Sequence, residues 1–353
     1  MLPHSIIDCD LHNELPSLQT LYPYLAPHWV DYCKESGFTE PDSRDYPMHS
    51  QHNSKSSIAY GGELLSSGLS MLRTQALDVM PSEIGILNCA YRVSAVHNSD
   101  LAAALATAVN QWQIAEWLNR EPRLRASIVV PSQQPELAAR EIDCFGDHPS
   151  FIQVIMPVRS EAPYGNRRYD PIYSAAVRHD LVIGIHYGGS TGLPSTPAGW
   201  ALTFWEEYAG MAQVFQSQVL SLIVEGVFDR FPALRVVLIE GGWTWLPSLL
   251  WRMDKEWSGL RHNTPWVSRP PSEYVREHLR LTTQPMDQPP SGRQLQQLMN
   301  QLESEEMLLF STNYPHNRYS SLIQALPTDI DKNLLAKILS ENARGFYRLA
   351  KTI

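Results

Sequence analysis

Short apolar segments recur along the chain and alternate with longer segments that have helical patterning. The eight apolar segments cover residues 5–12, 84–89, 124–131, 151–158, 181–186, 234–241, 279–284 and 307–313. Most are apolar throughout, as expected of strands that are buried on both faces of a sheet. Helices are expected between them, for instance over 100–119, 135–143, 170–179, 211–230 and 334–347. Eight alternating units predict an α/β fold whose parallel sheet closes into a (β/α)8 TIM barrel.

An open, doubly wound sheet is the main alternative to the closed barrel. Such a sheet usually carries a glycine-rich phosphate-binding turn after its first strand. This chain instead has the sequence DLHNE at residues 10–14. The lack of a glycine-rich sequence after the first predicted strand therefore favours the closed barrel.

The connection after the first strand is too long for an ordinary turn. It runs over residues 13–82 and is rich in Pro, Gly, His and Tyr. Loops of this size in a compact domain are usually functional lids or disordered segments. We therefore expect a lid, inserted into a barrel that spans residues 1–353 as a single domain. A second irregular connection, at 187–207, is expected on the same rim.

Composition and charge exclude several classes of protein. The 28 basic and 37 acidic residues leave a net charge of −9 without a basic stripe, so nucleic acid is not an expected partner. The longest apolar stretches are too short to cross a bilayer. No secretory signal is visible in the first residues, which favours the cytoplasm. The four cysteines lie far apart, which predicts buried free thiols and no disulfide framework.

Polar residues stand at the ends of four predicted strands. The first strand ends in Asp10 and His12, which are two apart and point to the same side. The fifth ends in His186, the sixth in Glu240, and the eighth in the sequence NYPH at 313–316. The carboxyl ends of barrel strands carry the active site. Carboxylate and imidazole together predict a divalent cation, zinc before manganese or magnesium, although a lone histidine would be an ordinary hydrogen-bonded barrel residue.

Four further residues near these strand ends are candidates for binding a substrate. His316 could contact the substrate or support the loop after the eighth strand. Trp243 could form an aromatic wall or pack in the core. Thr283 could hold a substrate oxygen, and Arg167 could bind a carboxylate or stay solvated.

Several of these segments together resemble the amidohydrolase-related proteins. They are IIDCDLH (6–12), the strand that ends in His186, FPALRVVLIEGGWTWLP (231–247), RMD (252–254), FSTNYPH (310–316) and ENARGFY (341–347). The motifs occur in the family's order over nearly the whole chain. More closely, the chain resembles the branch that includes aminocarboxymuconate-semialdehyde decarboxylase and the dihydroxybenzoate decarboxylases.

The resemblance implies a metal site and a homodimer. In this family the first strand usually contributes a His-x-His pair, sometimes with a carboxylate first, the fifth strand a His, and the eighth an Asp before Tyr-Pro-His. The implied metal ligands are Asp10, His12, His186 and Asn313. Asn313 departs from the pattern, because an amide oxygen is a neutral, weaker ligand that accepts no proton.

The resemblance also bears on the catalytic residues, which we expect to be Glu240, His186 and Asn313. The related decarboxylases have a catalytic His where this chain has Glu240. Glu240 is therefore the candidate for proton transfer, and a salt bridge to Arg252 is the alternative role.

Together these residues imply a metal-dependent enzyme that acts on a small carbonyl- or carboxylate-bearing molecule. We favour hydrolysis, because the sixth strand offers Glu240 and not a histidine. Non-oxidative decarboxylation of an aromatic or muconate-type acid is the first alternative. Asn313 leaves two others open, a metal-free hydrolase and a non-catalytic binding protein.

Overall fold

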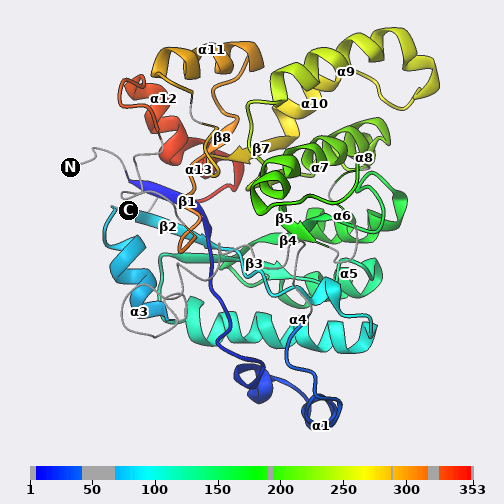
Figure 1. Ribbon diagram of the computed structural model, residues 1–353, viewed down its shortest axis with the longest axis vertical. Coiled ribbons are helices and arrows are strands. Elements are labelled where there is room, and N and C mark those ends of the chain that lie inside the picture. Colours follow the sequence, from blue (N-terminus) through cyan, green and yellow to red (C-terminus); the bar gives the residue numbers. More distant parts are fainter. Residues whose placement is uncertain are drawn as a thin grey trace.

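Eight parallel strands form the centre of the molecule (Figure 1). The computed structural model describes residues 5–41, 68–80, 82–189, 194, 196, 198–287, 289–316 and 326–350. The strands are hydrogen bonded in chain order, β1 to β8. Their bounds are Ile6–Leu11 (β1), Ser82–Leu87 (β2), Leu124–Val129 (β3), Phe151–Arg159 (β4), Val182–Gly189 (β5), Val236–Ile239 (β6), Leu279–Thr282 (β7) and Leu308–Leu309 (β8). All eight predicted strands are present.

The first and last strands meet and close the sheet. The backbone N–H of Cys9 donates to the carbonyl oxygen of Phe310 at 2.9 Å, and that of Asn313 donates to Asp10 at 3.0 Å. The N–H of His12 donates to the carbonyl oxygen of Tyr314 at 2.8 Å. The predicted (β/α)8 barrel is therefore confirmed, and the open doubly wound sheet is excluded.

Helices surround the strands (Figure 1). They are α4 (Ser99–Gln113), η4 (Ile114–Leu118), α5 (Pro135–Phe145), α6 (Asp170–Arg178), α7 (Phe204–Val224), α8 (Val227–Arg230), α9 (Leu246–Leu260), α10 (Pro271–His278), α11 (Gly292–Leu302), α12 (Lys332–Ala336), η7 (Lys337–Glu341) and α13 (Asn342–Phe346), with short 3-10 turns at η3 (Val93–Ala95), η5 (Arg167–Tyr169) and η6 (Arg261–Asn263). The helix predicted over 211–230 is split. Gly226 has a φ of +74°, which ends α7 before α8 begins.

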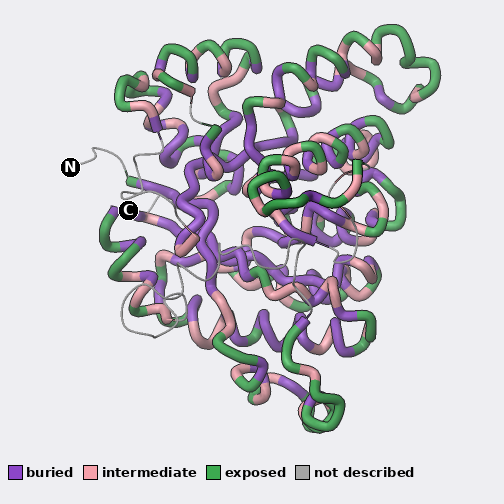
Figure 2. Tube along the Cα trace, viewed as in Figure 1, coloured by how far each residue is buried: buried purple, intermediate pink, exposed green. Residues whose placement is uncertain are grey.

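The barrel strands are the most deeply buried part of the chain (Figure 2). A small apolar cluster joins β1, β2, β5 and β6 to Phe346 and Tyr347 at the end of the chain. The guanidinium of Arg235, just before β6, donates to the carbonyl oxygen of Phe346. Arg344 likewise pairs with Glu83 in β2. These contacts place α13 across the amino ends of the strands, so the opposite end is left for a functional site.

The long first connection contains helices of its own. These are η1 (Leu18–Tyr24), α1 (Pro27–Ser36), α3 (Leu69–Leu72) and η2 (Arg73–Leu77). Residues 42–67 lie outside the described residues, so the lid stays a prediction. So does the single domain.

Two expectations from composition concern the cysteines and the membrane. All four cysteines are free thiols, as predicted, but only Cys9, Cys33 and Cys89 are buried. The predicted burial is wrong for Cys144, which is exposed on α5. Among the described helices, none has the length and apolar character that crossing a membrane requires.

Candidate metal centre

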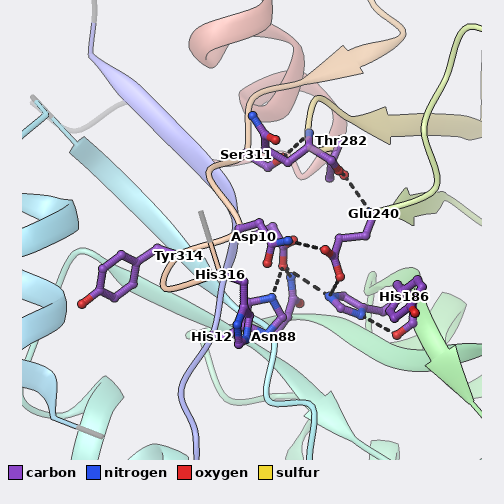
Figure 3. Close-up of polar contacts among 12 residues, drawn as sticks. Asp10, His12, Asn88, His186, Glu240, Thr282, Ser311, Tyr314 and His316 are labelled. Atoms are coloured by element: carbon purple, nitrogen blue, oxygen red, sulfur yellow. Dashed lines mark hydrogen bonds and ion pairs between the residues drawn. The ribbon is translucent and has the colours of Figure 1, made fainter. Parts of the chain in front are cut away.

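Asp10, His12 and His186 come together at the carboxyl ends of β1 and β5 (Figure 3). One ligand atom from each of the three lies within 4.8 Å of the others. Oδ1 of Asp10 is 3.4 Å from Nε2 of His12 and 3.5 Å from Nε2 of His186. All three side chains are buried. The structure therefore brings these three predicted ligand residues together, and their role as metal ligands stays a prediction.

Asn88, which directly follows β2, orients the carboxylate of Asp10. Its Nδ2 donates to Oδ1 of Asp10 at 2.9 Å, and its Oδ1 accepts from Oγ of Ser127 at 2.6 Å and from Nε2 of Gln153 at 3.0 Å. This chain of hydrogen bonds crosses from β1 to β4. Asn88 was not among the predicted site residues, although a single amide near the end of the apolar segment 84–89 could have indicated it.

Glu240 and Asn313 complete the cluster from β6 and β8. Nδ2 of Asn313 donates a hydrogen bond to Oε1 of Glu240. Oε2 of Glu240 lies 3.7 Å from Nε2 of His186. The hydroxyl of Tyr208 on α7, also missed by the sequence analysis, donates to Oε1 of Glu240 at 3.3 Å. The alternative pairing is wrong, because Arg252 instead forms an ion pair with Glu256 at 2.9 Å.

The backbone is strained at both of these residues. Glu240 has a φ of 62° and Asn313 a φ of 55°. A residue other than glycine in this left-handed region costs about 1–3 kcal/mol, and such strain clusters at functional sites. The N–H of Glu240 is fixed by Oγ1 of Thr282, at 3.2 Å. The fold thus holds the side chains of Glu240 and Asn313 in place at the cost of backbone strain, which lowers the stability of the folded protein.

Four buried polar atoms in the cluster have no hydrogen-bond partner among the described residues. They are Oδ2 of Asp10, Nε2 of His12, Nε2 of His186 and Oδ1 of Asn313. Each buried unsatisfied group costs about 1–3 kcal/mol. All four come from the predicted ligand residues, and they form a mixed oxygen and nitrogen donor set. These residues therefore fit a divalent cation.

The charges in the cluster depend on one another. Burial favours the neutral form of Asp10, but His12 and His186 outweigh it and hold the pKa of Asp10 well below its ordinary value. Burial also acts to lower the pKa of His186, but Asp10 and Glu240 raise it to about 9. Without a cation, a proton on His186 therefore takes the place of the positive charge that Asp10 attracts.

A third carboxyl group, that of Asp8, lies beneath the cluster. Burial raises the pKa of Asp8 to about 7, although the hydroxyl of Thr312 donates to its Oδ2 at 2.6 Å. Asp8 also accepts the N–H groups of Thr312 and Asp10, both at 3.1 Å. Asp8 thereby ties the ends of β1 and β8 together below the ligand residues.

Among the four predicted substrate-binding residues, the structure is compatible with the predicted role for His316 and Arg167. His316 joins the cluster, since its ring lies 5.0 Å from that of His12 and its Nε2 lies 3.4 Å from Oε1 of Glu14. Arg167 is exposed in η5, and its role stays a prediction.

Two of the predictions do not fit the structure. Trp243 is 0% exposed within the main core, so of its two predicted roles packing in the core is confirmed and the aromatic wall is wrong. Thr283 points away from the cluster, because its Oγ1 accepts the N–H of Ser311 at 3.0 Å and donates to the carbonyl oxygen of the same residue at 3.3 Å. Neighbouring residues of a strand face opposite sides. Thr282, and not Thr283, therefore faces the cluster, and its Oγ1 accepts the backbone N–H of Glu240.

The amino-acid sequence of the chain is similar to those of known proteins. Residues 7–349 match the family model described as Amidohydrolase. The γ-resorcylate decarboxylase of Polaromonas sp. (strain JS666 / ATCC BAA-500) is 26% identical over 305 residues, which cover 78% of this chain and 86% of that protein.

Two crystal structures are similar over nearly the whole chain. One is dihydroxybenzoic acid decarboxylase from Polaromonas sp. JS666 with bound manganese and the inhibitor 2-nitroresorcinol, with a TM-score of 0.70, 23% identity, and 99% of this chain and 98% of that chain covered. The other is 5-carboxyvanillate decarboxylase from Novosphingobium aromaticivorans DSM 12444 complexed with manganese and 4-hydroxy-3-methoxy-5-nitrobenzoic acid, with a TM-score of 0.73, 20% identity, and 99% and 97% covered. Both have the same fold as this chain.

Proposed function

The chain belongs to the amidohydrolase family of enzymes, and we propose that it is a metal-dependent, non-oxidative decarboxylase of a hydroxylated aromatic acid. The observation that carries this proposal is the convergence of four unsatisfied ligand atoms beside the carboxyl group of Glu240. The sequence favoured hydrolysis over decarboxylation. The relatives support the decarboxylase alternative instead, because all three that are named above are decarboxylases of aromatic acids.

We propose manganese as the cation, in place of the zinc that the sequence favoured. Both crystal structures of relatives hold manganese. The donor set contains no thiolate, and carboxylate and amide oxygens suit manganese as well as imidazole suits zinc. A cation held by Asp10, His12, His186 and Asn313 would stabilise negative charge on the carboxylate and phenolate oxygens of the substrate.

Glu240 is the proposed proton donor. Its carboxylate takes up a proton from solvent and gives it to the ring carbon that bears the leaving carboxylate. As this C–H bond forms, the bond between the ring and the carboxylate breaks, its electron pair returns to the ring, and carbon dioxide leaves. Glu240 is then a carboxylate again and can take up the next proton. Asn313 and Tyr208 position the carboxyl group for this transfer through their hydrogen bonds.

Product analysis tests the proposal. The manganese-loaded protein is incubated with γ-resorcylate or 5-carboxyvanillate, and the aromatic products and carbon dioxide are quantified. We expect one carbon dioxide for each resorcinol or vanillate formed. Glu240→Gln should lower kcat by about 10²–10⁴-fold, the usual contribution of a general acid.

A matched variant controls for the loss of a carboxylate elsewhere. The control variant is Glu303→Gln. Glu303 lies before β8, at the amino end of the barrel, and its side chain is 73% exposed. The variant should keep wild-type turnover. The proposal is wrong if the metal-loaded protein releases no carbon dioxide from either acid, or if Glu240→Gln is as active as Glu303→Gln. The homodimer also remains part of the proposal, and rests only on the resemblance to the family.

A further inference from the structure

Tyr347 directly follows α13, in the segment ENARGFY (341–347), which has no role in the proposed reaction. Its side chain is buried in the apolar cluster at the amino end of the barrel. Its hydroxyl donates a hydrogen bond to Oε1 of Gln153 in β4, at 2.7 Å. Burial raises the pKa of Tyr347 well above its ordinary value, so the hydroxyl keeps its proton and needs an acceptor.

Two buried amides connect Tyr347 to the metal centre. Nε2 of Gln153 donates to Oδ1 of Asn88 at 3.0 Å, and Nδ2 of Asn88 donates to Oδ1 of Asp10 at 2.9 Å. Gln153 and Asn88 are both 0% exposed. The hydrogen bonds therefore run in one direction through the interior of the barrel, from the hydroxyl of Tyr347 to the carboxylate of Asp10.

The orientation of each amide depends on its neighbour. If the amide of Gln153 were turned over, its oxygen would face the oxygen of Asn88, and the hydroxyl of Tyr347 would lose its acceptor. If the amide of Asn88 then turned as well, its oxygen would face the carboxylate of Asp10, which only accepts hydrogen bonds. The hydroxyl of Tyr347 thus favours the orientation in which Asn88 donates to Asp10.

Strand β5 leaves space for the amide of Gln153. A Cβ built on Gly184 would lie 2.6 Å from both Cδ and Nε2 of Gln153, which is closer than such atoms approach. Gly184 precedes His186 by two residues, so both face the same side of β5. A side chain at position 184 would therefore displace the amide from the interior of the barrel below the metal centre.

We infer that Tyr347 is a positioning residue for the metal centre and that it acts through Gln153 and Asn88. Oδ1 of Asp10 accepts from Asn88, whereas Oδ2 has no hydrogen-bond partner among the described residues and is the oxygen left for the cation. A hydroxyl at the amino end of the barrel thereby orients a ligand at the carboxyl end. This inference rests on the proposed function, because it requires a cation at Asp10.

Manganese titration of Tyr347→Phe, followed by the EPR signal of free manganese, tests this inference. The variant loses one hydroxyl and keeps the aromatic ring in its apolar cluster. We expect the Kd for manganese to rise about 10-fold, since the loss of an orienting group costs 10- to 100-fold in metal affinity. Gln153→Met removes the next member of the chain of hydrogen bonds and should raise the Kd at least as much.

Tyr173→Phe is the matched control. The hydroxyl of Tyr173 is also buried, and it donates to the carbonyl oxygen of Tyr164 at 2.6 Å, in a contact that does not lead to the metal centre. This variant should unfold at a lower temperature than the wild type, because it loses a buried hydrogen bond. It should nevertheless bind manganese with the wild-type Kd.

A double variant separates positioning from a general loss of structure. Two residues that act through one chain of contacts do not have additive effects, so Tyr347→Phe should not raise the Kd further when Asn88→Ala is already present. The inference is overturned if Tyr347→Phe binds manganese as tightly as Tyr173→Phe does, or if it raises the Kd by the same factor with and without Asn88→Ala. Both results leave the proposed decarboxylase intact. If the wild type itself binds no manganese, the proposed function is wrong, and the inference is wrong with it.

Discussion

Asn313, in the segment that follows β8, donates a hydrogen bond from its Nδ2 to Oε1 of Glu240, which directly follows β6. In the decarboxylases that the chain resembles, an aspartate is expected at the position of Asn313 and a histidine at the position of Glu240. In this chain the carboxyl group is that of Glu240 after β6, and its uncharged partner is Asn313 after β8. The pair therefore still contains one carboxyl group, which supports the proposed metal centre. Oδ1 of Asn313 has no hydrogen-bond partner among the described residues, which fits a role as a ligand of the proposed cation.

Replacing this amide with a carboxylate should strengthen metal binding. In Asn313→Asp a charged ligand replaces a neutral one, and we expect the Kd for manganese to fall roughly tenfold, about 1.4 kcal/mol. The new carboxylate would also lie against Glu240, and like charges this close favour a shared proton. Titration with manganese measures the Kd. Asn333→Asp on the exposed face of α12 is the control, and an unchanged or higher Kd in Asn313→Asp would contradict the assignment of this residue as a ligand.

Removing the metal should destabilise the folded protein. The four buried atoms that fit the cation would then lack partners. A ligand present at 100 times its Kd stabilises the fold by about 2.7 kcal/mol, and a chain of this size shifts its Tm by roughly 2–4 °C for each kcal/mol. Scanning calorimetry with EDTA should therefore show a loss of several degrees that added manganese restores. His12→Ala should show no response to EDTA, and a wild-type Tm that EDTA leaves unchanged would argue against a bound cation.

Asn88 should affect both stability and metal affinity, although it is not a ligand. Asn88→Ala frees the carboxylate of Asp10 and leaves Ser127 and Gln153 without their acceptor. The loss of such an orienting group typically lowers metal affinity 10- to 100-fold, and we expect a loss of about 1–3 kcal/mol in the free energy of unfolding. Urea unfolding and manganese titration measure the two effects. Asn119→Ala at an exposed position should change neither.

An ion-pair network far from the metal centre should make stability depend on pH. Hydrogen bonds from Arg123, and then from Arg73, lower the pKa of Glu121 to about 2 from 4.5, against the effect of burial. The folded pKa is below the unfolded one, so this stabilisation is complete above about pH 4.5 and is lost as the pH falls towards 2.

Glu121→Gln tests this network. It should cost about 1–2 kcal/mol at pH 7, and the difference from wild type should shrink as unfolding is measured at lower pH, down to pH 3. Glu116→Gln, which breaks an exposed pair with Arg120, should cost less than about 1 kcal/mol. A cost for Glu121→Gln that is the same at pH 7 and pH 3 would contradict the ionic origin of the effect.

The strands, and the clustering of the candidate ligand residues, could be predicted from sequence because apolar strands of a barrel present the polar residues at their carboxyl ends to one site. Thr283 was chosen over Thr282 because sequence alone does not fix which of two neighbours faces the cluster at a strand end. Asn88 carries no motif, and its importance depends on contacts that form only across the closed barrel. Trp243 is an aromatic residue at a strand end, but the turn after β6 directs it into the core.

The reaction in heavy water tests the central claim most directly. The manganese-loaded protein is incubated with 5-carboxyvanillate or γ-resorcylate in ²H₂O, and the products are followed by NMR. Proton transfer to the ring carbon predicts one deuterium at the position that the carboxylate has left, with equimolar carbon dioxide, and a rate that falls by orders of magnitude in Glu240→Gln. Unchanged aromatic acid after incubation with protein that holds one equivalent of manganese, without deuterium in the ring or carbon dioxide, would contradict the decarboxylase.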